Sequence, residues 1–432
     1  MAWAIQDMTN ELLFHLTIAT TPLCCETSTL GDRPMRLSDR ISAIGESATI
    51  AITAQARKMQ AQGLDVVSFA AGEPDFDTPQ FIKDAAKAAL DAGDTKYMPR
   101  SGEKLRQAIS DKLAKDNNLQ YPSDQIIITF GGKHALYVAF QCLINPGDKV
   151  LIPAPYWVSY TEMVKLAGGT PIIAKAPREQ GFKITPQQVL DAAAQGAKIM
   201  MINSPNNPTG VTYSREELSA IAQAVLKTDM IVFTDEIYEK LIYGDTKFVS
   251  FTSLDAALPA RTITFNGLAK TFSMPGWRIG WAAGPKDVIS AMKNLLSHQT
   301  TNPVSFVQAG ALAAYTDPRS AETVEAMRVQ FEKRGKHMAS RLASMPGVKC
   351  VEPTGAFYCF PDISAHFGRK LAVIDVTDST TFAKATLAGA RAAVVPGIEF
   401  GDDNCVRLSF ATSMEQINKG LDGLERMLKQ PM

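Results

Sequence analysis

The sequence lacks the features that mark several large classes of protein. Its six cysteines, spread over 432 residues, include no Cys-x-x-Cys spacing, so we expect no disulfide framework and reduced thiols in a cytoplasmic protein. Its five histidines are scattered without the spacing of metal ligands, so we expect no metal. No stretch approaches about 18 uninterrupted apolar residues, so nothing in the sequence is expected to span a membrane.

Charge of one sign is missing as well. Lys plus Arg and Asp plus Glu both number 44, which argues against nucleic acid or an anionic membrane as the main partner. The spacing of a P-loop is absent, and no GxGxxG follows the first strand, so nucleotide-binding folds lose support. What remains is the composition of a soluble globular protein, 46% apolar and 20% charged, whose length suits two domains.

Helical and strand patterns alternate from about residue 80 onward. Short apolar runs at 125–130, 149–155, 197–205, 230–236 and 262–265 are separated by segments of helical period, such as 102–117 and 215–228. Nearly continuous apolar strands that alternate with helices predict an α/β fold with a mostly parallel sheet sandwiched by helices. A long helical segment at 321–344 and the short strands after it predict a smaller α+β domain.

The first 34 residues differ from the rest. Asp7 and Glu11 precede a modest apolar stretch, where a signal peptide needs positive charge and a transit peptide is poor in acids. We interpret residues 1–34 as a poorly ordered extension from an upstream start; a short lipoprotein-like signal is the alternative.

Reactive side chains follow the predicted strands. In an open α/β sheet, ligands bind beyond the carboxyl ends of the strands. Taken singly, each residue has an ordinary explanation as a turn, a core aromatic, a helix cap or a surface lysine. Taken together, they meet at one edge and suit an anionic aromatic aldehyde held through a lysine imine. In chain order, the residues after the strands are Gly131, Gly132, Lys133, Trp157, Asn207, Asp235, Tyr238, Lys270 and Arg278.

Pyridoxal 5'-phosphate is the ligand that this set predicts. The glycine amides at a helix start would cradle its phosphate, with Arg278 as a bidentate partner. Trp157 would stack on the ring, and Asp235 would keep the pyridine nitrogen protonated, so that the ring accepts electrons. Asn207 and Tyr238 would bind the ring oxygen. Lys270 would form the imine and, once displaced, move a proton.

From about Met35 onward the chain resembles the fold-type I, class I aminotransferases, particularly the bacterial and plant-type branch of aspartate aminotransferases, which includes the aspartate/prephenate aminotransferases. The segments that carry the resemblance are AAGEPDFDTP (70–79), KYMPRSGEKLR (96–106), GGKHAL (131–136), PAPYWVSY (153–160), NSPNNPTG (203–210), TDEIYEKLIY (234–243), NGLAKTFSMPGWRIGW (266–281), TGAFY (354–358), VVPG (394–397) and VRLSFATS (406–413). The resemblance implies residues 35–78 as the N-terminal segment of a small domain, 79–320 as the large cofactor-binding domain and 321–432 as the small C-terminal domain.

The resemblance also implies roles for single residues. It gives Lys270 as the Schiff-base lysine and Asp235 as the pyridinium partner, and it adds Tyr97, which would reach the phosphate of the neighbouring subunit in a homodimer. Arg407 would clamp the substrate α-carboxylate, with Gly72 lining the pocket through its backbone. Lys133 and Thr49 would bind a distal carboxylate. Trp157 and Asn207 would contact the substrate as well as the cofactor.

Two departures from the family pattern bear on specificity. Gly267 stands where many relatives carry a serine, so one contact to the phosphate is expected to be absent. Gly45 stands where relatives that also transaminate prephenate carry a basic residue. We therefore expect an aspartate aminotransferase that uses 2-oxoglutarate. The alternatives are a prephenate, aromatic or alanine aminotransferase, a C–S β-lyase on the same scaffold, and a regulator or binding protein without turnover.

Overall fold

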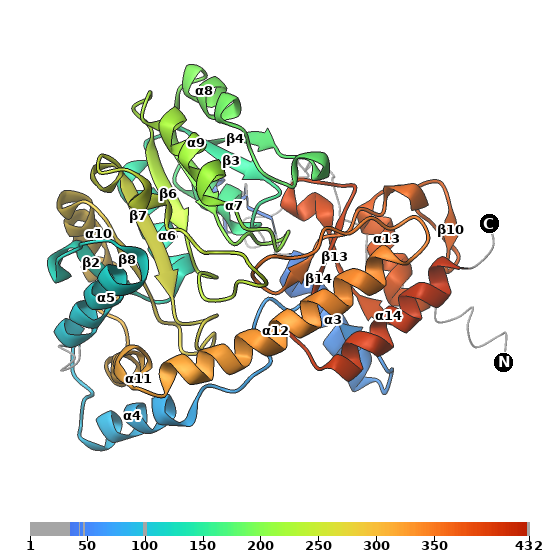
Figure 1. Ribbon diagram of the computed structural model, residues 1–432, viewed down its shortest axis with the longest axis horizontal. Helices are drawn as coiled ribbons and strands as arrows, with labels where there is room; N and C mark the ends of the chain where they lie inside the picture. The colour runs from blue at the N-terminus through green and yellow to red at the C-terminus, as the bar shows by residue number, and fades with distance from the viewer. Residues whose placement is uncertain (1–34, 43, 46–47, 98–101, 430–432) are drawn as a thin grey trace. The chain divides into compact units, whose positions relative to one another are not determined.

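The structure is a computed structural model that describes residues 35–42, 44–45, 48–97 and 102–429. The chain divides into two units, residues 1–42 and 43–432. The described part of the first unit contains one short helix, α2 (Asp39–Ser42). The extension expected over residues 1–34 lies outside the described residues. The second unit holds the sheets and the candidate site (Figure 1).

A seven-stranded sheet forms the centre of the described part of the second unit. Its strand order is β2-β8-β7-β6-β5-β3-β4. β8 runs antiparallel to both neighbours and the other ladders are parallel, which confirms the predicted α/β class. The strands are β2 (Ile126–Thr129), β3 (Lys149–Ala154), β4 (Thr170–Lys175), β5 (Ala197–Asn203), β6 (Ile231–Asp235), β7 (Thr262–Gly267) and β8 (Gly280–Ala283).

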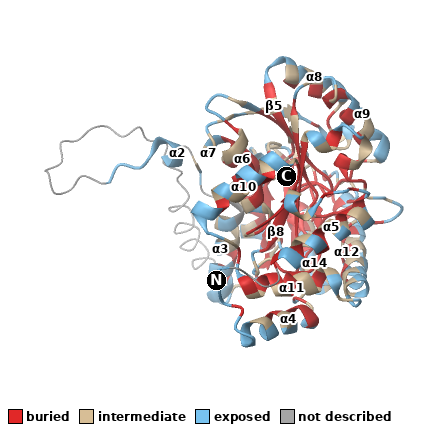
Figure 2. Ribbon diagram, turned by 90° about the vertical axis from the view of Figure 1, so that its left-hand side faces the viewer, coloured by how far each residue is buried: buried red, intermediate tan, exposed pale blue. Residues whose placement is uncertain are grey.

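Helices cover both faces of this sheet because its strands carry apolar side chains on both sides. Val150 and Ile152 pack with α6, α7 and α10, whereas Leu151 between them packs with α8 and α9 on the opposite face. Figure 2 shows the inner strands in the buried colour and the surrounding helices with mixed colours. The helices are α4 (Gln80–Asp91), α5 (Gly102–Asn117), α6 (Gly132–Leu143), α7 (Ser159–Leu166), α8 (Pro186–Ala194), α9 (Arg215–Val225), α10 (Lys286–Gln299) and α11 (Ser305–Thr316).

The C-terminal part builds smaller sheets beside a long helix. Val67 and Phe69 share one apolar cluster with residues of α12 and α14, so the segment before α4 packs with the end of the chain. β9, β13 and β14 form an antiparallel sheet, β1 pairs in parallel with β12, and β10 pairs with β11. The elements are α3 (Ala48–Ala61), β1 (Val67–Ser68), α12 (Ser320–Ala343), β9 (Tyr358–Cys359), β10 (Lys370–Leu371), β11 (Ile374–Asp375), α13 (Ser379–Ala385), β12 (Ala392–Ala393), β13 (Val395–Pro396), β14 (Val406–Ser409) and α14 (Met414–Leu428).

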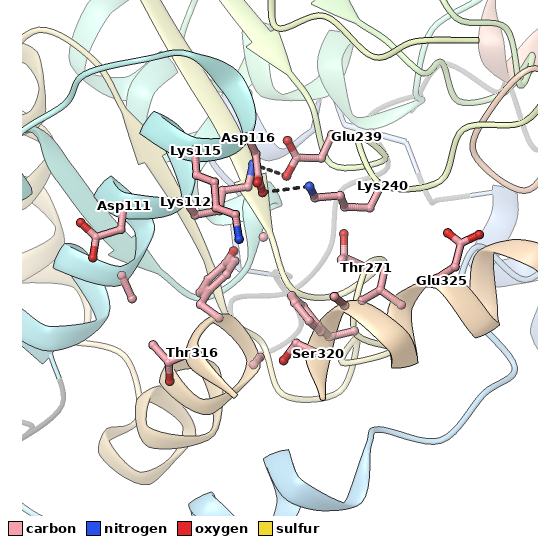
Figure 3. Close-up of a pocket in the computed structure, with 17 residues that line it drawn as sticks. Asp111, Lys112, Lys115, Asp116, Glu239, Lys240, Thr271, Thr316, Ser320 and Glu325 are labelled. Atoms are coloured by element: carbon pink, nitrogen blue, oxygen red, sulfur yellow. Dashed lines mark hydrogen bonds and ion pairs between the residues drawn. The ribbon is translucent and has the colours of Figure 1, made fainter. Parts of the chain in front are cut away.

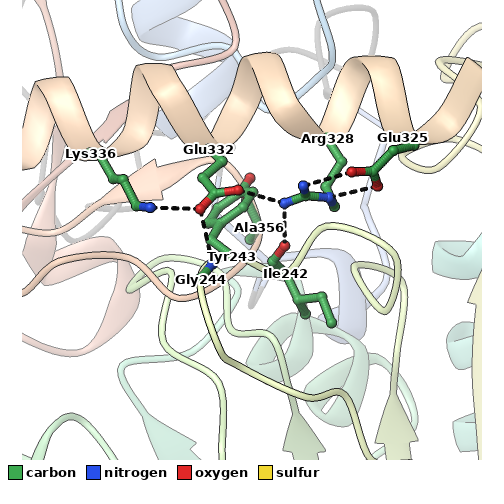
Figure 4. A network of polar contacts seen from close by, with 8 residues as sticks. All are labelled: Ile242, Tyr243, Gly244, Glu325, Arg328, Glu332, Lys336 and Ala356. Carbon is green, nitrogen blue, oxygen red and sulfur yellow. Dashed lines mark hydrogen bonds and ion pairs between the residues drawn. The ribbon is translucent and has the colours of Figure 1, made fainter.

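An ion-pair network fastens α12 to the segment after β6 (Figure 4). Arg328 contacts Glu325 and Glu332 at 2.7 Å each and donates to the Ile242 carbonyl at 3.1 Å. Glu332 also accepts from the Gly244 amide at 3.0 Å, and its contacts with Lys336 and Arg328 lower its pKa to about 2. These bonds fix the chain that follows Tyr238, one of the predicted site residues.

The packing of β6 predicts the effect of a core truncation. The Phe233 ring lies 4.9 Å from that of Phe140 and 5.0 Å from that of Phe265. Phe233→Ala is expected to lower the free energy of unfolding by about 3–5 kcal/mol, because the ring is fully buried and its removal leaves a cavity. Urea unfolding followed by fluorescence measures this. Val329→Ala, at a half-exposed position of α12, should change it by no more than about 0.5 kcal/mol; equal losses would contradict the packing.

Candidate active site

The predicted residues meet at one edge of the central sheet. β2, β3, β5, β6 and β7 all run in the same direction, because the one reversed strand, β8, lies between β2 and β7. Their carboxyl ends therefore share an edge, and the loops that follow carry the predicted side chains. Arg407 arrives separately, on β14 of the C-terminal part.

Asp235 ends β6 as a buried carboxylate. Its Oδ2 accepts a hydrogen bond from the Tyr160 hydroxyl at 2.7 Å, and its Oδ1 accepts from the Ile237 amide at 3.2 Å. Burial raises the pKa of Asp235 to about 6, against the lowering effects of Tyr160, the Ile237 amide and Lys270. A protonated ligand group beside this carboxylate would keep the carboxylate ionised, and the pKa of the ligand group would rise in turn.

Lys270 follows β7, and its amine points at the loop after β1. Nζ donates to the Gly72 carbonyl at 2.5 Å and lies 5.7 Å from the centre of the Phe357 ring. Burial, assisted by the cations Arg278, Arg407 and Lys133 and opposed by Glu73, lowers the pKa of Lys270 to about 8. Near neutral pH an appreciable fraction of this amine is therefore unprotonated and nucleophilic.

Arg407 is a buried cation without a carboxylate partner among the described residues. Its side chain donates to Asn207 Oδ1 at 3.1 Å and to the Ala70 carbonyl at 2.8 Å, while Nε has no hydrogen-bond partner in the described part of the chain. The residue is only 2% exposed, and burial lowers its pKa. Because a buried cation is costly unless paired, this arrangement suits an anionic ligand.

Two tyrosine hydroxyls meet beside these charges. Tyr238 Oη lies 2.9 Å from Tyr358 Oη, and both side chains are buried. Burial holds the pKa of both hydroxyls above the ordinary value, so both are neutral hydrogen-bond donors at neutral pH.

A glycine cradle lies where α6 begins. Gly131 has φ +88°, and a Cβ there would lie 2.6 Å from Arg278 Nη2. A Cβ on Gly280, at the start of β8, would lie 2.4 Å from the Gly132 amide nitrogen. The Gly131 amide donates to the Thr129 carbonyl at 2.8 Å and is therefore already engaged, contrary to its predicted role. The next amides, of Gly132 and Lys133, start the helix beside a guanidinium and form a site for an anion such as phosphate.

Lys133 and Trp157 lie together at this edge. Lys133 Nζ lies 4.9 Å from the centre of the Trp157 ring. Partial burial and the nearby Arg278 lower the pKa of Lys133, and no carboxylate partner is found for it among the residues described. The ammonium group is thus available to a ligand.

Two further predicted residues lie on other elements. Tyr97, predicted to act in the neighbouring subunit, is 77% exposed, and Thr49 belongs to α3, where its side chain lies outside the described part of the structure. The sequence interpretation gave no roles to Tyr160 and Tyr358, although both lie in motif segments that it used, PAPYWVSY and TGAFY. Nothing in the spacing of those segments indicates which other side chain each tyrosine contacts.

A cavity of about 440 Å³ lies behind the Lys270 loop and is lined by α5, α11, α12, Gly267 and Thr271 (Figure 3). Its wall includes two ion pairs: Lys112 contacts Glu239, and Lys240 contacts Asp116 at 2.8 Å. Apart from Gly267, it contains none of the residues that the sequence interpretation singled out. We therefore place the candidate site at the strand ends and not in this cavity.

The described residues contain no group of three or more His, Cys, Asp and Glu side chains arranged to hold a metal ion. No helix among them is long and apolar enough to cross a membrane.

The fold and this edge define an α/β enzyme of the group-transfer class, with a reactive lysine amine among buried charges. The sequence model of aminotransferase class I and II matches residues 64–424, so the chain belongs to that family and is an aminotransferase. It is 46% identical to the aspartate aminotransferase of Bacillus subtilis over 92% of this chain and all of that protein. It is 43% identical to the aspartate/prephenate aminotransferase of Cereibacter sphaeroides, over 89% of this chain and 96% of that one.

Solved structures agree with this membership. The Thermus thermophilus aspartate aminotransferase with maleate superposes with a TM-score of 0.85 at 40% identity, over 91% of this chain and all of that one. The aspartate aminotransferase of Rhizobium meliloti gives a TM-score of 0.87 at 33% identity, over 91% of this chain and 99% of that one.

The lowered pKa of Lys270 predicts a measurable reactivity. In the cofactor-free protein, acylation of Lys270 by trace acetic anhydride should increase as pH rises through about 8, because only the unprotonated amine reacts. Lys286, whose pKa Asp124 raises, is the internal control and should react only at higher pH. Mass spectrometry of peptides reads both sites; identical pH profiles would contradict the burial of Lys270.

Proposed function

We propose that the protein is a pyridoxal-phosphate-dependent aspartate aminotransferase, which moves the amino group of L-aspartate to 2-oxoglutarate in a ping-pong cycle. The products are oxaloacetate and L-glutamate. The observation that carries the proposal is the buried Arg407 guanidinium, unpaired with any described carboxylate, at the same edge as the Lys270 amine and Lys133. The names of the relatives at 45–46% identity support the same substrate.

The cofactor fits the residues present. The amides of Gly132 and Lys133, with Arg278, would hold its phosphate, and the absence of a Cβ at Gly131 leaves room for the Arg278 guanidinium beside them. Asp235 would pair with the ring nitrogen, Trp157 would stack on the ring, and Asn207 and Tyr238 would bind the ring oxygen. When bound, the cofactor supplies an electron sink for the carbanion at the substrate α-carbon.

The chain's own groups would orient the amino acid and move its proton. Arg407 would clamp the α-carboxylate through two parallel N–H donors, beside the Gly72 backbone. The Lys270 amine, with a pKa of about 8, is suited to take the α-proton and to return it, since a catalytic base works best with a pKa near the working pH. Lys133 and Thr49 would bind the distal carboxylate, which selects dicarboxylic substrates.

A second copy of the chain would complete the site. Tyr97 is a large, mostly exposed side chain and is therefore accessible to a second copy of the chain. We propose that in a homodimer it reaches the cofactor phosphate of the neighbouring subunit. The division into a large domain (79–320) and a small domain (35–78 and 321–432), and the cytoplasmic location, remain predictions.

Prephenate is the less favoured substrate. Gly45 has no side chain and no neighbour within 4 Å of an added Cβ, so this position offers no additional cation to the distal carboxylate of prephenate. Aromatic or alanine transamination and C–S lysis would leave the Lys133 ammonium facing an apolar side chain, which is costly.

Lys270→Ala is the first test. Aspartate–2-oxoglutarate transfer should fall by about 10⁴-fold or more, because both the nucleophile and the proton carrier are lost. In the unmodified enzyme, L-aspartate without keto acid should change the visible absorption of the bound cofactor and release oxaloacetate; the variant should release no oxaloacetate. Lys198→Ala, which removes a lysine paired with Asp148 at 2.6 Å, is the control. Unchanged turnover in Lys270→Ala would refute the proposal.

Lys133→Met tests the choice of substrate. We expect kcat/KM for aspartate to fall by about ten- to a hundredfold, as for the loss of one charge-assisted hydrogen bond, with little change for alanine. Lys175→Met, at the exposed end of β4, is the matched control and should change neither. Equal losses for aspartate and alanine would assign Lys133 to the phosphate instead of the distal carboxylate.

A further inference from the structure

Tyr358 is a fully buried side chain whose ring and hydroxyl both contact residues of the site. It lies in β9, opposite Ser409 of β14, and is thus carried by the strand pair that also delivers Arg407. The Arg407 guanidinium carbon lies 4.6 Å from the centre of the Tyr358 ring. The Tyr358 hydroxyl lies 2.9 Å from the Tyr238 hydroxyl.

The hydroxyl of Tyr358 also lies close to the backbone segment that accepts a hydrogen bond from Lys270. A Cβ added to Gly72 would lie 3.2 Å from Tyr358 Oη, and the Gly72 carbonyl accepts the Lys270 amine. The ring cannot move away, since Phe357 packs against it with ring centres 4.7 Å apart and Arg407 lies over it. The hydroxyl is therefore fixed between Tyr238 and Gly72.

The direction of the Tyr238–Tyr358 hydrogen bond follows from the donor count. In the structure either oxygen can be the donor. Each hydroxyl has one hydrogen, so if Tyr238 donates to an acceptor in the site, only Tyr358 can donate to Tyr238. A hydroxyl that accepts a hydrogen bond becomes a stronger donor, because hydrogen bonds in a chain polarise one another. The Arg407 cation lowers the pKa of both hydroxyls against the effect of burial, so the direction depends on the acceptor that Tyr238 meets in the site.

We propose that Tyr358 is a positioning residue of the aminotransferase site, which holds the Tyr238 hydroxyl so that its hydrogen points at the ring oxygen of the bound cofactor. This inference rests on the proposed function. A donor held on the ring oxygen stabilises negative charge there, so that oxygen retains the neighbouring proton less tightly and the pKa of the chromophore falls. Because the Tyr358 ring also contacts Arg407, it connects the Tyr238–Tyr358 hydrogen bond with the residue proposed to bind the substrate α-carboxylate.

Tyr358→Phe removes only the hydroxyl and keeps the ring under Arg407. In the cofactor-loaded enzyme we expect the pKa of the visible absorption band to rise by about half a unit to one unit, as for the loss of one hydrogen bond. We expect kcat to fall severalfold and KM for aspartate to stay within about twofold, because Arg407 keeps its contacts. Tyr213→Phe is the matched control: it removes a buried hydroxyl whose partner is the Ile184 amide at 3.0 Å and not Tyr238.

A double-mutant cycle separates positioning from general packing. In the Tyr238→Phe background, Tyr358→Phe should no longer change the pKa of the absorption band, because its effect passes through the Tyr238 hydroxyl. The same shift in both backgrounds, or no shift beyond that of Tyr213→Phe, would overturn the inference. If the unmodified enzyme binds the cofactor but its absorption ignores aspartate, the proposed substrate fails instead, and the absorption pKa still tests Tyr358.

Discussion

The burial of the Arg407 guanidinium is the constraint on which the rest of the site depends. A cation removed from water must be met by acceptors, and here an amide oxygen and a main-chain carbonyl meet it in place of a carboxylate. Those acceptors belong to Asn207, after β5, and Ala70, after β1, while the ring centres of Tyr358 and Phe400 lie 4.6 and 5.0 Å from the guanidinium carbon. One side chain thus joins the central sheet to the C-terminal sheets and leaves a positive charge for a ligand.

Near that cation, burial shifts the pKa values of two titrating groups toward neutral pH. Asp235 and Lys270 are both desolvated, which raises the pKa of the acid to about 6 and lowers that of the amine to about 8. Tyr160 and the backbone amide of Ile237 keep the carboxylate oriented, whereas the neighbouring cations keep the amine from holding its proton tightly. A carboxylate that stays ionised beside an amine that readily loses its proton suits a reaction that moves protons at a substrate carbon.

The sheet supplies the geometry that these charges need. Parallel strands bring five carboxyl ends to one edge, and the reversed β8 packs its first residue, Gly280, against the start of α6. This close approach requires glycine at position 280, because a Cβ there would lie 2.4 Å from the Gly132 amide nitrogen, and glycine at 131 makes room for Arg278. The glycine cradle at the start of α6 and the reversed strand β8 are therefore parts of one packing arrangement.

The sequence alone determined the fold class and the loops that carry the chemistry, because apolar period and strand-end residues are local signals. It did not predict β4, which is only half-buried, or β8, which is short and opens with glycine. Nor did it predict the Tyr160–Asp235 and Tyr238–Tyr358 bonds, whose partners lie 75 and 120 residues apart. Only the tertiary structure decides such pairs, because a hydrogen bond between distant residues depends on how strands are ordered in space and leaves no period in the chain.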